Sequence, residues 1–167
     1  MTSVVLYPDR KRGHRDAKTF RAVPDNLQGL YEQTITALNQ NLDALCAGGL
    51  RAIIEGLCAD QGVTEGLVPK RNPDRTPVLK TDGSPELVKS KNLEGKIEGL
   101  AQKGVLTVPH AHVLHEHRYI GNEALHELKS IDRSALALAL DIVEQTFTTV
   151  YELPRQQRIL ERKRKKR

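Results

Sequence analysis

The chain has 167 residues, which suits one domain with a single buried core better than two domains. Aromatic residues make up 4% and Trp is absent, so a sheet sandwich rich in aromatic residues is not expected. The apolar residues are mainly aliphatic, which is typical of packed helices. The net charge of +5 indicates a nucleic-acid partner only where the cations share a surface.

The charge is divided between two basic ends and an acidic body. Residues 1–24 hold six Lys/Arg and two Asp, and residues 155–167 hold eight Lys/Arg and one Glu. Residues 25–154 hold twelve Lys/Arg and eighteen Asp/Glu. We therefore predict an irregular basic segment over 1–24, a helical domain over 25–154 and a basic tail over 155–167.

The C-terminal tail supplies the candidate phosphate contacts, which are Arg162, Lys163, Arg164, Lys165, Lys166 and Arg167. Two alternatives stay open for the basic ends: they are solvated and bind nothing, or they hold a second, acidic subunit.

The cysteines and the apolar runs bound the cellular setting. Cys46 and Cys58 lie twelve residues apart on one predicted helix, about 18 Å along its axis, too far for a disulfide. Both fall on the apolar stripe, so they are interpreted as core residues. No apolar run approaches the ~20 residues of a membrane span, and the apolar stretch at the N-terminus is too short for a signal peptide. The expected location is the cytoplasm.

The first two helices follow from three-and-four spacing of apolar residues. One is predicted from Asp25, a candidate N-cap, to Asn39, and the second carries a broad stripe from Leu42 to Cys58. Gly48-Gly49 inside the second costs roughly 1 kcal/mol per glycine, which indicates close approach of a neighbouring helix. Arg51 and Glu55, four residues apart, are predicted to form an ion pair.

Residues 61–91 lose this periodicity. Their prolines and glycines predict a long irregular connection, and the charged composition favours a mobile loop over an ordered lid. A short helix follows around Leu93, Ile97 and Leu100 and ends at Lys103-Gly104.

Two more helices complete the predicted fold. Pro109 suits the first turn of the fourth, and Ser130 or Asp132 can cap the fifth, whose stripe runs from Leu136 to Tyr151. The residues after Pro154 can extend that helix but have no core to join. The fold class is therefore predicted to be all-α, a small up-down bundle of four to five helices with a long Pro-rich loop between the second and third.

The fourth helix carries the candidate catalytic residues. Arg118, Asn122 and His126 recur every fourth residue, which lines them up as a polar ridge on one side of a helix. Arg offers a fork of donors to phosphate, His exchanges protons near neutral pH, and Asn can orient either group. Such a set can promote metal-independent cleavage of RNA. The alternative is structural: Asn122 breaks or caps the helix after Gly121, Arg118 pairs with Glu55 or another carboxylate, and His126 forms a hydrogen bond with a neighbouring helix.

The histidines at 110, 112, 115 and 117 raise the question of a metal site. No cysteine or carboxylate cluster completes a tetrahedral set with them, so a solvated helix start is the preferred interpretation. We expect no metal and no cofactor.

Four stretches carry a family resemblance: "LYEQTITALNQNLDALCAGGLRAIIEGL", "LEGKIEGLAQKGVL", "HRYIGNEALHE" and "ALDIVEQTFTTVYELP". Over about residues 24–153 the chain resembles a bacterial domain of unknown function, found alone or attached to restriction and other defence proteins. That domain is usually placed in the HEPN superfamily (higher eukaryotes and prokaryotes nucleotide-binding).

The resemblance implies a four-to-five-helix bundle, commonly a homodimer, and in many members a metal-independent ribonuclease of toxin-antitoxin or antiphage systems. His126 and Asn122 match the histidine and the polar position of the superfamily motif. The arginine is often found just before the polar position, where this chain has Gly121, and the nearest upstream arginine is Arg118.

Two hypotheses follow. In the first, the protein cleaves RNA, with His126 as acid and base, Arg118 stabilising the phosphate and Asn122 positioning. In the second, it is a non-catalytic module that binds nucleic acid or a partner protein, such as an antitoxin or another defence protein.

Overall fold

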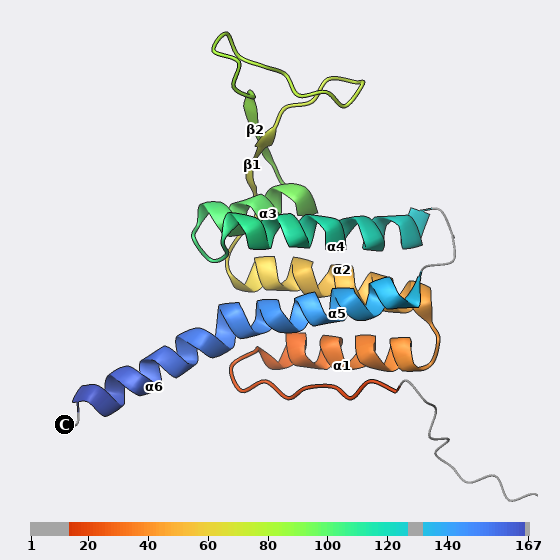
Figure 1. The fold of residues 1–167 in the computed structure, drawn as a ribbon, viewed down its shortest axis with the longest axis vertical. Helices are drawn as coiled ribbons and strands as arrows, with labels where there is room; N and C mark the ends of the chain where they lie inside the picture. The colour runs from red at the N-terminus through yellow and green to blue at the C-terminus, as the bar shows by residue number, and fades with distance from the viewer. Residues whose placement is uncertain (1–13, 127–131, 166–167) are drawn as a thin grey trace, which may run out of the picture.

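The computed structural model describes residues 14–126 and 132–165, with side chains up to residue 119 and again from residue 132. The elements run in the order α1 (Asp25–Asn39), α2 (Asp43–Asp60), β1 (Gly66–Pro69), β2 (Leu87–Ser90), α3 (Leu93–Gln102), α4 (Val108–His126), α5 (Arg133–Phe147), a π-helical turn (Thr148–Glu152) and α6 (Leu153–Lys165) (Figure 1). The protein is mostly helical, as predicted, with a small two-stranded sheet that the sequence did not predict.

Helix α2 is the centre of the bundle. It contacts α1, α3, α4 and α5, and its apolar stripe is buried from Cys46 to Cys58, while Leu42 and Leu45 at its start are exposed. The fully covered side chains of this stripe are Cys46, Leu50, Ile53, Ile54, Leu57 and Cys58. Both cysteines are therefore core residues, as expected, and neither forms a disulfide.

The close contact between α1 and α2 explains why position 49 of α2 is a glycine. A Cβ atom on Gly49 would lie 2.3 Å from Oγ1 of Thr34, which is buried in α1 and donates to the carbonyl of Leu30. The close approach inferred from the sequence is present here. Asp25 opens α1 but does not cap it, because the cap position is Pro24 and no side chain fills the role.

The interval 61–91, predicted to be an irregular loop, contains an antiparallel pair of strands. Gly66 pairs with Ser90 and Pro69 with Leu87, and the whole segment from 66 to 90 (the arm) stands out from the helices (Figure 1). The strands escaped prediction because each is four residues long and has no regular apolar alternation.

Main-chain hydrogen bonds join the three passes of the arm in a closed ring. The amide of Lys70 donates to the carbonyl of Glu86 (2.7 Å), the amide of Glu86 to that of Val78 (2.8 Å), and the amide of Val78 to that of Lys70 (2.8 Å). These bonds give the arm internal order although no residue from 70 to 90 is buried.

Two similar turns close the ends of the arm. Asp74 accepts hydrogen bonds from the amide and hydroxyl of Thr76, and Asp82 accepts the same pair from Ser84. The residue after each aspartate has a positive φ, 69° at Arg75 and 81° at Gly83. Side-chain-to-backbone bonding of this kind is the usual way in which aspartate stabilises a turn.

Glycines seat the base of the arm on α3. A Cβ on Gly95 would lie 2.0 Å from the carbonyl oxygen of Ser90, and one on Gly99 would lie 2.4 Å from that of Glu65. Gly66 meets the backbone of α3 from the other side, 2.1 Å from its nearest atom by the same measure. The backbones can therefore touch only because three side chains are absent.

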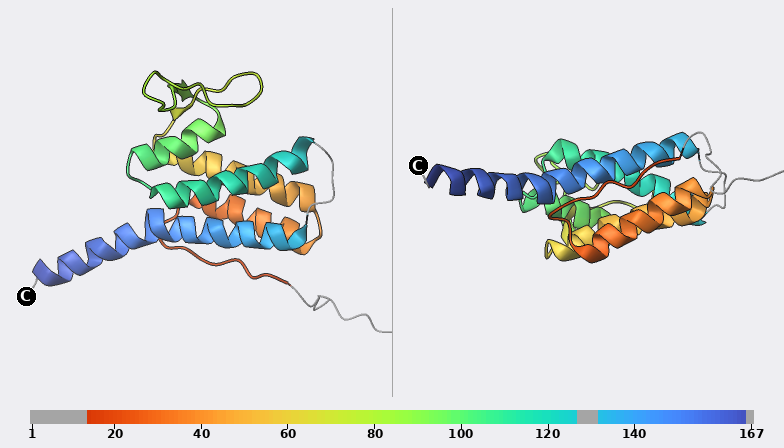
Figure 2. Two further views of the ribbon diagram at one scale, coloured as in Figure 1. Left: turned by 45° about the horizontal axis from the view of Figure 1, so that its top comes forward. Right: turned by 90° about the horizontal axis from the view of Figure 1, so that it is seen from below.

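Helix α6 leaves the bundle at the π-helical turn. Asp132 caps α5 through the amide of Ser134, and the helix then continues through the π turn into α6 without a break. Figures 1 and 2 show α6 pointing away from the other helices. None of its residues is buried, so the basic tail extends the helix without adding to the core.

We predict opposite effects for alanine at two helical glycines. Gly95→Ala should lower the free energy of unfolding by about 1–3 kcal/mol, because the new methyl group displaces the backbone of Ser90. Gly29→Ala, where no atom lies within 4 Å, should leave stability unchanged or raise it by up to about 1 kcal/mol. Urea unfolding measures both, and equal effects at the two sites would contradict the packing described.

Candidate functional site

Helix α4 is continuous through Gly121 and Asn122 as far as His126, the last residue described in this part of the chain. The alternative in which Asn122 breaks the helix is therefore wrong. The Cα atoms of Arg118, Asn122 and His126 follow one another at four-residue intervals on this helix, which places the three residues along one side of it. The side chains of Asn122 and His126 lie outside the described residues, so only Arg118 has a described environment.

Arg118 is a covered side chain with an acidic neighbour. Its Nη1 lies 3.8 Å from Oε2 of Glu94 on α3, its guanidinium stacks 4.6 Å from the ring centre of Tyr119, and 14% of the side chain is exposed. Among the described residues, its Nε has no hydrogen-bond partner. Glu94, and not Glu55, is thus the carboxylate near Arg118. Its negative charge partly neutralises the guanidinium that would otherwise attract a phosphate.

Arg51 and Glu55 form the predicted pair on α2, with Nη2 and Oε1 3.2 Å apart. Because both side chains are partly exposed and belong to one helix, the pair contributes only a few tenths of a kcal/mol.

The histidines at the start of α4 are mostly packed, so the solvated interpretation is wrong for three of the four. Nε2 of His115 lies 2.8 Å from Oε1 of Glu98, and Nε2 of His110 lies 2.9 Å from Oγ1 of Thr146. His117 is 2% exposed, and burial lowers its pKa to about 4, so it is neutral at physiological pH. His112 is exposed.

Metal and thiol chemistry find little support in the described part of the chain. No three His, Cys, Asp or Glu side chains there are grouped to hold a metal ion. Burial raises the pKa of Cys46 to about 11 and that of Cys58 to about 12, which keeps both thiols protonated.

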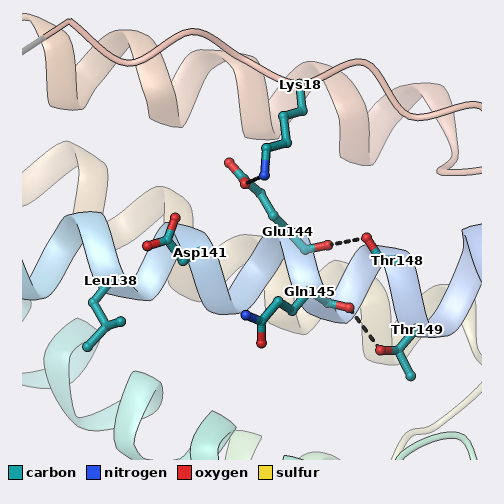
Figure 3. A pocket seen from close by; sticks show the side chains of 7 residues that line it. All are labelled: Lys18, Leu138, Asp141, Glu144, Gln145, Thr148 and Thr149. Atoms are coloured by element: carbon teal, nitrogen blue, oxygen red, sulfur yellow. Dashed lines mark hydrogen bonds and ion pairs between the residues drawn. The ribbon is translucent and has the colours of Figure 1, made fainter.

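A buried carboxylate that the sequence did not predict lies at the junction of α1, α5 and the N-terminal segment. Glu144 on α5 is 3% exposed and accepts hydrogen bonds from Arg15 (2.6 Å) and the hydroxyl of Tyr31 (2.7 Å). Lys18 forms an ion pair with its other oxygen (Figure 3). The signal was present, because Glu144 continues the four-residue series of Leu136 and Leu140 on the buried face.

These contacts hold residues 14–24, an extended segment, against the helices. Arg15 also reaches Asp141 (2.6 Å), and the amides of Arg21 and Ala22 both donate to Oε1 of Glu152 (2.6 and 2.7 Å). Burial alone would raise the pKa of Glu144, but hydrogen bonds from Lys18, Arg15 and Tyr31 outweigh it, so the pKa is lowered and the group stays ionised.

An open pocket of about 490 Å³ lies beside this network, lined by Lys18, Leu138, Asp141, Glu144, Gln145, Thr148 and Thr149 (Figure 3). Its ionisable groups are already engaged, Glu144 by Lys18 and Asp141 by Arg15. The pocket therefore shows no group poised for catalysis.

Helix α6 is the most basic element of the structure. It carries six Lys/Arg and one Glu, and no ion pair involves these cations within the described residues. Of the predicted phosphate contacts, Arg162, Lys163, Arg164 and Lys165 lie on this helix, and Lys166 and Arg167 lie outside the described residues.

The family model for a domain of unknown function, DUF4145, matches residues 32–163. This match covers most of the chain, so the protein belongs to that family, and the expectation of a domain of unknown function is confirmed. The matched range includes the arm and nearly all of α6. No curated protein and no solved structure matches the chain. None of the described helices is long and apolar enough to cross a membrane.

The buried carboxylate predicts an acid-sensitive contribution to stability. Because the folded pKa of Glu144 is lowered from 4.5, its contribution is present above about pH 4.5 and is lost as the pH falls through the folded pKa. Glu144→Gln should cost about 1–3 kcal/mol at pH 7, and its deficit relative to the wild type should shrink below pH 4.5.

Asp141→Asn is the matched control, because Asp141 shares Arg15 but is half exposed. It should cost less than Glu144→Gln in urea unfolding at pH 7. A Glu144→Gln deficit that stays constant from neutral to acid pH would contradict the account of this network.

Proposed function

We propose that this protein is a nucleic-acid-binding helical module whose principal contact is α6. The observation that carries the proposal is the state of the α6 cations: six Lys/Arg on a helix with no buried residue and, within the described residues, no ion pair. The phosphates of a nucleic acid are anions that can pair with the unpaired cations of such a helix.

Arginines packed between the helices and the N-terminal segment differ from the cations on α6. Arg15 is bound by Asp141 and Glu144, Arg118 lies near Glu94, and Arg133 lies 3.0 Å from Asp43. These arginines are occupied in holding the fold together. These three arginines are therefore not available to an external polyanion, whereas the cations of α6 are.

The geometry of α6 suits a phosphate backbone. Arg155, Arg158, Arg162 and Lys165 follow one another at three- and four-residue intervals, which places them on one face of the helix. A 13-residue helix is marginal by itself in water, but α6 continues from α5 through the π turn and so needs no separate nucleation.

The proposal extends to the cellular role and the assembly of the protein. The resemblance to HEPN proteins supports a role in a bacterial defence or toxin-type system, in the cytoplasm, as a homodimer that brings two α4 ridges together and can receive an antitoxin or another defence protein. It also supports the first of the two hypotheses, RNA cleavage.

Metal-independent RNA cleavage is the second candidate function, and the continuity of α4 favours it. A regular helix aligns Arg118, Asn122 and His126. In that reaction His126 takes the proton of a ribose 2′-hydroxyl, the oxygen attacks phosphorus, and the 5′-oxygen leaves with the proton that His126 gives back, yielding a 2′,3′-cyclic phosphate. Arg118 would stabilise the phosphorane. The nearby Glu94 carboxylate weakens this role of Arg118, so nucleic-acid binding is better supported than cleavage.

Neutralising α6 tests the binding function. Arg158→Gln with Arg162→Gln should lower the slope of log K against log salt by about 2, because two phosphate contacts are lost. Glu161→Gln, which removes the one acid of α6, should tighten binding. Fluorescence anisotropy with labelled nucleic acid measures both, and the absence of buried residues in α6 predicts unchanged thermal unfolding.

The cleavage function has its own test, incubation with total RNA in the presence of a chelator. It predicts fragments ending in cyclic phosphate, formed by the wild type and by the exposed control His112→Ala, and lost in His126→Ala and Arg118→Ala variants that remain folded. RNA that is bound but stays intact would remove this second candidate and leave the binding function standing.

A further inference from the structure

We infer that the arm, residues 66–90, is a second contact for nucleic acid and that the ligand is double-stranded. This inference rests on the proposed function and names its substrate class. The arm is an ordered extension without a core of its own. The arm and α6 both lack aromatic side chains.

The arm is built to present side chains, not to bury them. Between Lys70 and Leu79 nearly every residue is exposed, and the arm projects from the helices (Figures 1 and 2). An isolated two-stranded hairpin is marginally stable in water. The ring of main-chain hydrogen bonds and the glycine contacts with α3 supply the order that a core would otherwise provide.

The charge of the arm favours a polyanion. It contains five Lys/Arg and three Asp/Glu, and the acids are engaged within the arm. Asp74 and Asp82 accept turn hydrogen bonds, and Glu86 pairs with Lys70 at 2.8 Å. Arg75 and Lys80 form no ion pair with any described residue, and both are exposed.

Arg75 occupies a position that normally favours glycine. Its φ of 69° is in the left-handed region, which costs a non-glycine residue roughly 1 kcal/mol or more. The equivalent position of the other turn is Gly83. An arginine therefore stands at one tip of the arm in spite of its backbone cost, and Asp74 and Thr76 hold it there.

The absence of aromatic side chains points to a duplex. Neither residues 66–90 nor residues 153–165 contain Phe, Tyr, Trp or His. Proteins that bind single strands stack the bases on aromatic side chains, whereas a duplex hides its bases and presents its phosphates. Two elements with cations and no aromatic residues fit the outside of a duplex, and a two-stranded ribbon is narrow enough for the major groove of DNA.

The experiment uses the full chain and a labelled duplex of about two helical turns, some 20 base pairs. The duplex is prepared as DNA and as RNA, and each strand is also tested alone. We expect tighter binding to duplex than to single strands at equal salt, and the preferred duplex identifies DNA or RNA as the ligand. Arg75→Gln with Lys80→Gln should weaken duplex binding several-fold and lower the salt slope by up to about 2.

Lys89→Gln is the matched control, because it removes one charge from a lysine already paired with Glu65 at 2.5 Å. It should change duplex binding less than the combined Arg75→Gln and Lys80→Gln substitution does. Circular dichroism checks that each variant is folded.

A failure of the inference about the arm can be told apart from a failure of the proposed function. Arm variants that bind as the wild type does, alongside α6 variants that do not bind, would overturn the inference and leave the proposed function intact. Equal or tighter binding of single strands would overturn the duplex assignment. A wild-type protein that binds none of these nucleic acids would remove the proposed function and the inference together.

Discussion

The ionised carboxylate of Glu144, buried among α1, α5 and the N-terminal segment, is the interaction on which the arrangement of the molecule depends. An unpaired charge in this position would cost several kcal/mol, so Arg15, Lys18 and Tyr31 must be in place when the helices pack. The same N-terminal segment donates two amides to Glu152, at the end of the π turn. One segment thus fixes α5 against α1 and also fixes the point where α6 leaves the bundle.

This arrangement separates two uses of positive charge. Within the body, arginines pair with carboxylates across helices, as Arg133 does with Asp43, and the net charge of residues 25–154 is acidic. Outside the packed helices α1 to α5, α6 and the arm carry cations without such partners in the described structure. Because an acidic surface repels phosphate, the proposed binding mode places a nucleic acid away from the bundle and against its two projections.

Periodicity predicted helices α1 to α5 because each of them buries apolar side chains, and α1 begins and ends at the predicted residues. The arm escaped because main-chain bonds and turns hold it, and these leave little apolar pattern in the sequence. For the site, the sequence correctly aligned Arg118 with Asn122 and His126 on one helix, but the partner of Arg118 is on α3 and pairing across helices has no local signal. Glu144 was similarly missed, since its partners lie more than a hundred residues away.

The most direct test of the account is an amide chemical-shift titration of the isotope-labelled protein with a duplex of about 20 base pairs. The account predicts that perturbed amides concentrate in α6 and in the arm, with α1 unaffected, and that the perturbations weaken as salt is added. Perturbations centred on the acidic helices of the body, or none in α6, would contradict it.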